Sequence, residues 1–283
     1  MKKKILLPTD FSKNSWNAIA YAIELYKNEL VDFYLLNAFN ASTYIQDILV
    51  VPDEGETLFE RSKKKSQMGL KKILLQIKAH GENRDHNYFT ASVFDSPLDA
   101  VKNCIEAKDI ELVIVSNKGE TNDLDTILGS NTIDMMEKVR NCPVLMIPAD
   151  VTFKEPNEIV FPTSFKTHYK RRELTHLYEI AKITNAPIRV LHISKEDELS
   201  QDQIEKKALL EECLDGLEYS FHYLENTNVN NGLKLFVQSR ESEMIVFINK
   251  KHAFFGSVLT KPMVKDLGYS SKVPVLALHD LRN

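Results

Sequence analysis

An internal repeat limits the folds that are open to this chain. The segment ILLPTDF at residues 5–11 returns as IVFPTSF at 159–165, and ELVIVSNK at 111–118 returns as EMIVFINK at 243–250. CPVLMI at 142–147 returns as VPVLAL at 273–278. Three matches in the same order indicate a tandem duplication. We therefore expect the 283 residues to form two units of ordinary domain size, 1–150 and 157–283, joined by a polar segment.

Short apolar runs alternate with amphipathic segments within the first unit. We expect strands at 5–7, 33–36, 88–94, 112–115 and 144–147, and helices at 13–28, 57–80, 97–105 and 131–140. Wholly apolar runs are typical of parallel strands that are covered on both faces. Strands that alternate with helices predict right-handed crossovers. The predicted fold class is α/β: two tandem, doubly wound, Rossmann-like domains, each a five-stranded, mostly parallel sheet with helices on both faces.

A proline precedes the last strand of each unit, at Pro143 and Pro274. Proline is tolerated at the start of an edge strand, so both last strands are expected at sheet edges. Two edges in one chain can pair with each other and so remove both exposed edges. This arrangement would be an intrachain pseudo-dimer, and a homodimer of whole chains stays open.

Composition limits the partners and the location that we expect. The formal net charge of −4 gives no electrostatic case for nucleic acid or an anionic membrane as a partner. The Lys63-Lys64-Lys65 run is interpreted as the solvated face of a helix. The N-terminus has too short an apolar run for a signal peptide, and no segment is apolar over the length of a membrane span. Three scattered cysteines without CxxC pairing are expected to be buried reduced thiols. The predicted location is the cytoplasm.

The stretch VIVSNKGETNDLDTILGSNT at 113–132 has two interpretations. A strand is followed by Gly119 and then by Gly129-Ser130 at the start of a helix. Glycine lets the backbone approach a phosphate, and a helix N-terminus presents free amides to it. Alternatively, Gly119 only ends a strand and Ser130 or Asn131 only caps a helix. The stretch alone leaves both interpretations open.

The order of elements, PTDFS at 8–12, the Gly119–x9–Gly129-Ser130 spacing and CPVLMIP at 142–148 together resemble the universal stress protein family in its tandem, two-domain form. The resemblance extends over essentially the whole chain. It implies the Rossmann-like fold also described as adenine nucleotide alpha hydrolase-like, and a role in the stress response. One branch of the family binds adenine nucleotides through G-x2-G-x9-G-(S/T) after the fourth strand.

The resemblance implies an ATP site, with Mg²⁺ as an accompanying cation, in the first unit. Asp10 would contact the nucleoside, a main-chain position just after the second strand would meet adenine, and the glycine loop would cradle the phosphates. The candidate site residues are Pro8, Thr9, Asp10, Asn37, Ala38, Ser116, Lys118, Gly119, Gly129, Ser130 and Asn131.

The chain departs from the family pattern at two places in this loop. Ser116 replaces the first motif glycine, but it is small and can still donate a hydrogen bond. Glu120, Asp123 and Asp125 crowd the insert. Their charges would repel a triphosphate unless they face solvent or hold a divalent cation.

The second unit lacks most of the motif. Ser164 stands where the first unit has Asp10, and Lys251 stands where it has Gly119. Gly256-Ser257 comes too early in the segment to match Gly129-Ser130. This unit is expected to be a structural copy that binds no nucleotide.

Sequence motifs of catalysis are missing. GxSxG, HExxH, the Walker motif and paired-cysteine metal motifs do not occur, and slow hydrolysis of ATP is the most that we expect. Two functions follow as hypotheses: a cytoplasmic stress-response regulator that binds an adenine nucleotide in its first unit, or a nucleotide-free interaction scaffold of the same fold.

Overall fold

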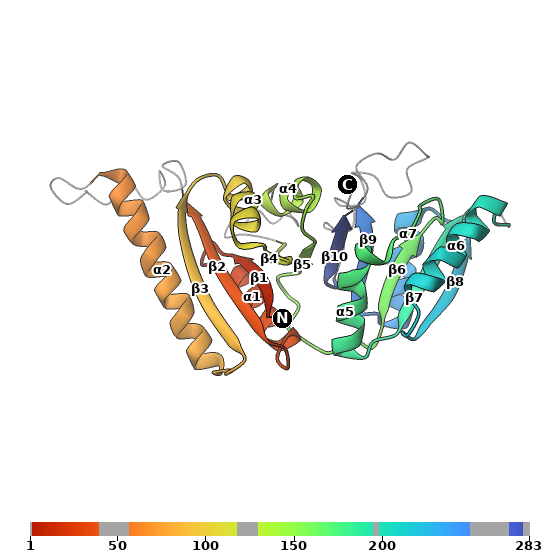
Figure 1. Ribbon diagram of the computed structural model, residues 1–283, viewed down its shortest axis with the longest axis horizontal. Helices are drawn as coiled ribbons and strands as arrows, with labels where there is room; N and C mark the ends of the chain where they lie inside the picture. The colour runs from red at the N-terminus through yellow and green to blue at the C-terminus, as the bar shows by residue number, and fades with distance from the viewer. Residues whose placement is uncertain (1, 40–56, 118–129, 195–197, 250–271, 280–283) are drawn as a thin grey trace.

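The computed structural model describes residues 2–39, 57–117, 130–194, 198–249 and 272–279 (Figure 1). Its strands are β1 (Lys3–Pro8), β2 (Val31–Phe39), β3 (His86–Phe94), β4 (Leu112–Ser116), β5 (Val144–Ile147), β6 (Ile159–Thr163), β7 (Ile188–Ser194), β8 (Tyr219–Glu225), β9 (Met244–Asn249) and β10 (Val275–His279). The helices are α1 (Lys13–Leu25), α2 (Leu58–His80), α3 (Pro97–Lys108), α4 (Ser130–Lys138), α5 (Thr175–Thr184), α6 (Gln201–Cys213) and α7 (Val229–Arg240), with a 3₁₀ turn η2 (Arg171–Glu173).

The described strands form one ten-stranded sheet with the order β3-β2-β1-β4-β5-β10-β9-β6-β7-β8. Each half contributes five strands that are parallel to one another. In both halves the first strand lies next to the second strand on one side and the fourth on the other, which is the doubly wound order. The predicted α/β fold class is confirmed.

The two halves join through β5 and β10, the strands that follow the two prolines. These strands pair antiparallel, with Val144 opposite Ala277, Leu145 opposite Leu276 and Met146 opposite Val275. The last strand of each half is therefore interior to the sheet. The outer edges of the whole sheet are β3 and β8.

The expected boundaries needed small corrections. Helix α1 ends at Leu25 rather than at residue 28, because the backbone turns at Tyr26 and Glu29 N–H bonds back to its carbonyl. Helix α4 spans Ser130–Lys138 rather than 131–140. Strand β2 runs on to Phe39, beyond the expected end at residue 36.

Helices cover both faces of the sheet and bury two apolar cores. One core packs α1, α2, α5 and α6 against the sheet and contains Leu7, Phe33, Leu177 and Leu210. The opposite core packs α3, α4 and α7 and contains Val101, Met136 and Leu233. Each core includes residues of both halves, so the apolar packing continues across the β5–β10 junction. Of the cysteines, Cys142 and Cys213 are buried free thiols as expected, whereas Cys104 is only half-buried. No described helix is both long and apolar enough to cross a bilayer.

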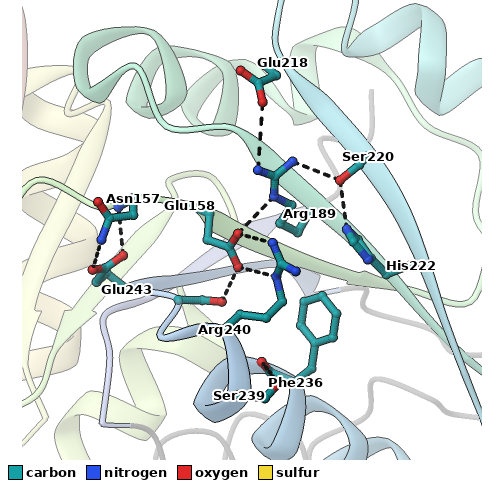
Figure 2. A network of polar contacts seen from close by, with 11 residues as sticks. Asn157, Glu158, Arg189, Glu218, Ser220, His222, Phe236, Ser239, Arg240 and Glu243 are labelled. Carbon is teal, nitrogen blue, oxygen red and sulfur yellow. Dashed lines mark hydrogen bonds and ion pairs between the residues drawn. The ribbon is translucent and has the colours of Figure 1, made fainter.

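A network of charged residues lies at the amino ends of the strands in the second half (Figure 2). The buried Glu158 carboxylate accepts hydrogen bonds from Arg189 Nε at 3.0 Å and Arg240 Nη2 at 2.7 Å, and from Ser242 Oγ at 2.6 Å. Burial alone raises the pKa of Glu158, but the bonds from Arg240, Ser242 and Arg189 outweigh it and lower the pKa to about 2. The ion pair links the start of β6 to β7 and to the last residue of α7.

The network makes stability depend on pH in a defined window. The folded-state pKa of Glu158 lies below the ordinary value of 4.5, so its contribution is complete above about pH 4.5 and is lost as pH falls to about 2. We expect Glu158→Gln to lower the free energy of unfolding by about 3 kcal/mol at pH 7 and to have little effect at pH 2. Denaturant unfolding of both proteins across this range measures the difference.

Glu218 provides the matched control for this experiment. Its carboxylate lies 3.9 Å from Arg189 but its side chain is 76% exposed. We expect Glu218→Gln to change the free energy of unfolding by less than about 0.5 kcal/mol. An equal effect of the two substitutions would show that burial of Glu158 is not what makes its ion pairs stabilising.

Candidate functional site

The candidate site lies where β1, β2 and β4 end, at the carboxyl edge of the first half. The turn from β1 to α1 is held by its own side chains. Thr9 Oγ1 accepts from Phe11 N at 3.0 Å, and Asp10 Oδ1 accepts from Ser12 N at 3.1 Å and Ser12 Oγ at 2.6 Å. Ser12 in turn caps α1 by accepting from Ser15 N at 3.1 Å. These bonds place the exposed Asp10 carboxylate beside the N-terminus of α1.

Asn37 lies beneath this turn and is 4% exposed. Its Nδ2 donates to Thr9 O at 2.7 Å, which ties the end of β2 to the turn after β1. Its Oδ1 is buried and has no hydrogen-bond partner among the described residues. A buried acceptor without a donor costs free energy, so this oxygen marks a position where a donor group is missing.

The position of Asn37 and Ala38 corrects the sequence-based expectation. Both residues lie inside β2, which continues to Phe39, and not after the strand. Asparagine is disfavoured in strands because its side chain competes for backbone hydrogen bonds. Here the side-chain amide of Asn37 donates to Thr9 O. The backbone of Asn37 therefore keeps its pairing with β3, opposite Ser92. Ala38 is half-buried on the opposite face of the sheet.

The third wall of the site is the end of β4 and the start of α4. Thr132 Oγ1 donates to Ser116 O at 2.7 Å, and both residues are buried. Asn117 Oδ1 accepts from Ala149 N at 2.9 Å, which ties the end of β4 to the segment after β5. The N-terminus of α4, nine residues long, is thereby held against the edge of the sheet.

The structure brings together one part of the predicted site. Pro8 and Ser116 end adjacent parallel strands, Thr9 and Asp10 follow β1 directly, and Asn37 lies near the carboxyl end of β2, where its side chain bonds Thr9 O. Ser130 and Asn131 begin α4, and Asn131 is exposed. Lys118, Gly119 and Gly129 lie outside the described residues.

Three polar residues that organise the site were not among the predicted ones. Ser15 bonds Thr9 Oγ1 at 3.0 Å, Asn117 ties β4 to β5, and Thr132 ties α4 to β4. The repeat carried a signal for one of them, because Asn117 recurs as Asn249. Asn249 makes a different contact: its Nδ2 donates to Met136 O in α4 of the first half at 2.8 Å.

The second half keeps the same turn but fills the space around it. Thr163 Oγ1 accepts from Phe165 N at 3.1 Å and bonds the Tyr169 hydroxyl. His192 takes the place of Asn37, and its Nδ1 donates to Thr163 O at 2.9 Å. Burial lowers the pKa of His192, against the hydrogen bond to Thr163 that raises it. Phe165 stacks on the imidazole with the ring centroids 4.9 Å apart.

The two halves therefore differ in what occupies the same location. In the second half an imidazole and the fully buried Phe165 ring occupy it, and Ser164 offers no carboxylate. In the first half a smaller carboxamide and the Asp10 carboxylate are present, and the Phe11 ring is directed toward Gly69 of α2. Among the residues that the structure describes around this turn, Asn37 Oδ1 of the first half is a buried acceptor without a hydrogen-bond partner, and Asp10 on the turn is exposed.

The sequence was compared with known proteins and families. The sequence model of the Universal stress protein family matches residues 1–148, which is more than half of the chain. The chain belongs to the universal stress protein family. Over 147 residues it is 28% identical to Universal stress protein MJ0531 of Methanocaldococcus jannaschii, a match that covers 51% of this chain and 81% of that protein.

Solved structures share the fold of this universal stress protein over its whole length. A universal stress protein from Archaeoglobus fulgidus aligns with a TM-score of 0.71 at 17% identity and covers 98% of each chain. A functionally unknown protein, PA1789, from Pseudomonas aeruginosa aligns with a TM-score of 0.63 at 14% identity, over 98% of this chain and 92% of that one. At these identities the likeness concerns the fold.

The described residues of the site offer hydrogen-bonding groups for a ligand. Among the residues that the structure describes, no three His, Cys, Asp or Glu side chains converge as metal ligands. What the described site presents is one carboxylate, one buried carboxamide oxygen and two helix N-termini. This combination suits recognition of a polar ligand that carries hydrogen-bond donors and an anionic group.

Gly69 of α2 leaves room for the ring of Phe11, whose backbone has a left-handed φ of 68°. A Cβ at Gly69 would lie 2.4 Å from the Phe11 ring. We expect Gly69→Ala to destabilise the protein by about 1–3 kcal/mol, although glycine to alanine inside a helix normally stabilises by about 1 kcal/mol. Thermal or denaturant unfolding measures the change.

Gln67→Ala is the control, because Gln67 lies two residues away on the exposed face of the same helix. It should alter the free energy of unfolding by less than about 0.5 kcal/mol. A stabilised Gly69→Ala protein would show that the Phe11 ring does not need this close approach.

Proposed function

We propose that this universal stress protein binds one adenine nucleotide, ATP or a close relative, in its first half and acts as a stress-response regulator in the cytoplasm. The observation that carries the proposal is the unsatisfied, buried Asn37 Oδ1 at the same strand edge as the exposed Asp10. Ligands of doubly wound sheets bind at this edge. A base or ribose supplies N–H and O–H donors that such acceptors can take.

The phosphates would lie toward α4. The start of α4 is held next to the end of β4 by the bond between Thr132 Oγ1 and Ser116 O. Free amides and the dipole at a helix N-terminus favour an anion. Gly119, Gly129 and Ser130 would cradle the phosphates, with Ser116 and Asn131 at the two ends of the loop. Mg²⁺ held near Glu120, Asp123 and Asp125 would offset their charge against the phosphates.

The proposed stoichiometry is one nucleotide per chain. The second half keeps the turn through Thr163 but replaces Asp10 with Ser164 and Asn37 with His192. Because Phe165 stacks on His192, rings occupy the location that the first half leaves to the carboxamide. Nucleotide bound at the Gly119–Gly129 loop of the first half would change the surface that partners meet.

A nucleotide-free interaction scaffold is the second candidate. The three carboxylates of the 118–129 insert favour it, because they oppose a triphosphate unless a cation is present. The scaffold would use the same fold and would need no ligand at Asp10 or Asn37.

Calorimetric titration of the nucleotide-stripped protein with ATP, with and without Mg²⁺, tests the proposal. We expect one site per chain, with tighter binding in the presence of Mg²⁺. Asp10→Ser should weaken binding by about tenfold to a hundredfold, because it removes a charged hydrogen-bond acceptor. The substitution should fold normally, since Ser164 holds the same turn in the second half by accepting from Lys166 N at 3.4 Å.

Ser164→Asp is the matched control, because it makes the converse change in the second half and should leave the affinity unchanged. Gly129→Trp should abolish binding by blocking the phosphate loop. No heat at millimolar ATP would favour the scaffold. Binding that survives both Asp10→Ser and Gly129→Trp would place the nucleotide elsewhere, and two sites per chain would mean that the second half also binds.

A further inference from the structure

Helix α2 is strongly basic in a chain that is acidic overall. It spans 23 residues, Leu58–His80, and carries seven lysine or arginine residues against one glutamate. Its net charge is therefore +6, whereas that of the whole chain is −4. In Figure 1 α2 lies at one extreme end of the molecule, beside the edge strand β3.

The outward face of α2 is a continuous stripe, which we call the α2 stripe. Its residues are Lys64, Met68, Lys71, Lys72, Leu75 and Lys78, all exposed. The spacings of 4, 3, 4 and 3 residues from Lys64 through Lys71 and Leu75 to Lys78 keep these side chains on one side of a helix. The opposite side, with Leu70, Ile73 and Ile77, is buried against the sheet.

Two large apolar side chains lie between the lysines of the α2 stripe. Met68 is 50% exposed and Leu75 is 68% exposed, and one heptad separates them. Lys64, Lys71 and Lys72 have no ion pair among the described residues, and Lys78 has one long contact of 3.4 Å with the exposed Glu82. An exposed pair of this kind neutralises little charge.

We propose that the α2 stripe is a docking surface for an anionic lipid bilayer. Charge complementarity carries the proposal: basic side chains run along a helix about 34 Å long, and a bilayer with acidic headgroups presents negative charge over the same length. The stripe would lie flat on the headgroups, with Met68 and Leu75 directed into the interfacial region.

Shape and chemistry favour a lipid surface over two other anionic partners. The stripe runs along the exposed side of a helix at the end of the molecule (Figure 1), and a planar bilayer can contact its whole length, which a small acidic protein surface does not. Nucleic acid would pair with the lysines, but phosphates and sugars offer no apolar region for Met68 and Leu75. A bilayer accepts both kinds of side chain.

The net charge of the whole chain does not oppose this docking. Charges are screened over about 8 Å at physiological ionic strength, and α2 is much longer than that distance. A bilayer that meets the stripe therefore interacts mainly with its four lysines rather than with the acidic remainder of the protein. Docking at this end would leave Asp10 and the first-half site on another surface, the carboxyl edge of the sheet.

Flotation of the full-length protein with vesicles tests the proposal. We expect the protein to float with phosphatidylcholine vesicles that contain 30% phosphatidylserine, and not with pure phosphatidylcholine. Lys64→Glu/Lys71→Glu/Lys72→Glu should lower the partition coefficient by at least on the order of a hundredfold, since each lysine at an anionic surface contributes about fivefold and each new glutamate adds repulsion. Met68→Ser/Leu75→Ser should lower it by about tenfold.

The matched control reverses three exposed lysines elsewhere, Lys27→Glu/Lys166→Glu/Lys234→Glu. It makes the same change in net charge, and it should retain vesicle binding within about threefold. Circular dichroism melting checks that all variants fold. Equal losses in the two triple variants, or equal binding to both kinds of vesicle, would overturn the proposal.

A 20-base-pair DNA duplex at the same salt concentration provides the competing arm. Tighter binding to the duplex than to the phosphatidylserine vesicles, with loss in the α2 triple variant but not in Met68→Ser/Leu75→Ser, would make the stripe a nucleic-acid surface and overturn the lipid assignment. The absence of vesicle binding by the unaltered protein would also overturn it.

Discussion

The antiparallel pairing of β5 with β10 is the contact on which the rest of the molecule depends. A strand at the end of a parallel sheet leaves backbone N–H and C=O groups without partners. These groups cost free energy when they are buried, and they can pair with another chain when they are exposed. Pairing Val144–Met146 with Val275–Ala277 satisfies one edge of each half at the same time. Both apolar cores can then extend across the junction, and the two halves become one sheet with common faces.

Duplication gave the two halves the same turn, and substitutions at a few positions gave them different chemistry. Thr9 and Thr163 both accept a bond from the backbone N–H of a phenylalanine with a left-handed φ. Above that shared turn, Asn37 and His192 donate to the same carbonyl, but the carboxamide keeps a second, unsatisfied oxygen and the imidazole stacks on a ring. Two substitutions, of Asp10 by Ser164 and of Asn37 by His192, thus replace the polar groups of the first half with a hydroxyl and a stacked imidazole.

The charged parts of the molecule are also divided between its ends. At the amino ends of the second-half strands, the buried Glu158 carboxylate pairs with two arginines in a network that stabilises the fold. At the far end of the first half, the four lysines of the α2 stripe face outward and leave a local positive field, and three of them form no ion pair with the residues that the structure describes. The same residue types therefore stabilise the structure where they are buried and paired, and mark a contact surface where they are exposed.

Much of this could be predicted from the sequence by itself. The repeat, the apolar strand runs and the helix-start signals led to two doubly wound units with mostly parallel strands, because wholly apolar runs and patterns of period 3.6 report local structure directly. The tertiary structure decided what depends on distant contacts. Asn37 stays in a strand because Thr9 O takes its amide, α1 stops early at a backbone turn, and Asn249 reaches across to α4 of the other half. The lysines of α2 are close in the sequence, but the tertiary structure decided which of them face outward, because Leu70, Ile73 and Ile77 are buried on the opposite side of the helix. Sequence patterns carry the information that lies within a few residues, and the site and its surfaces arise from residues that only folding brings together.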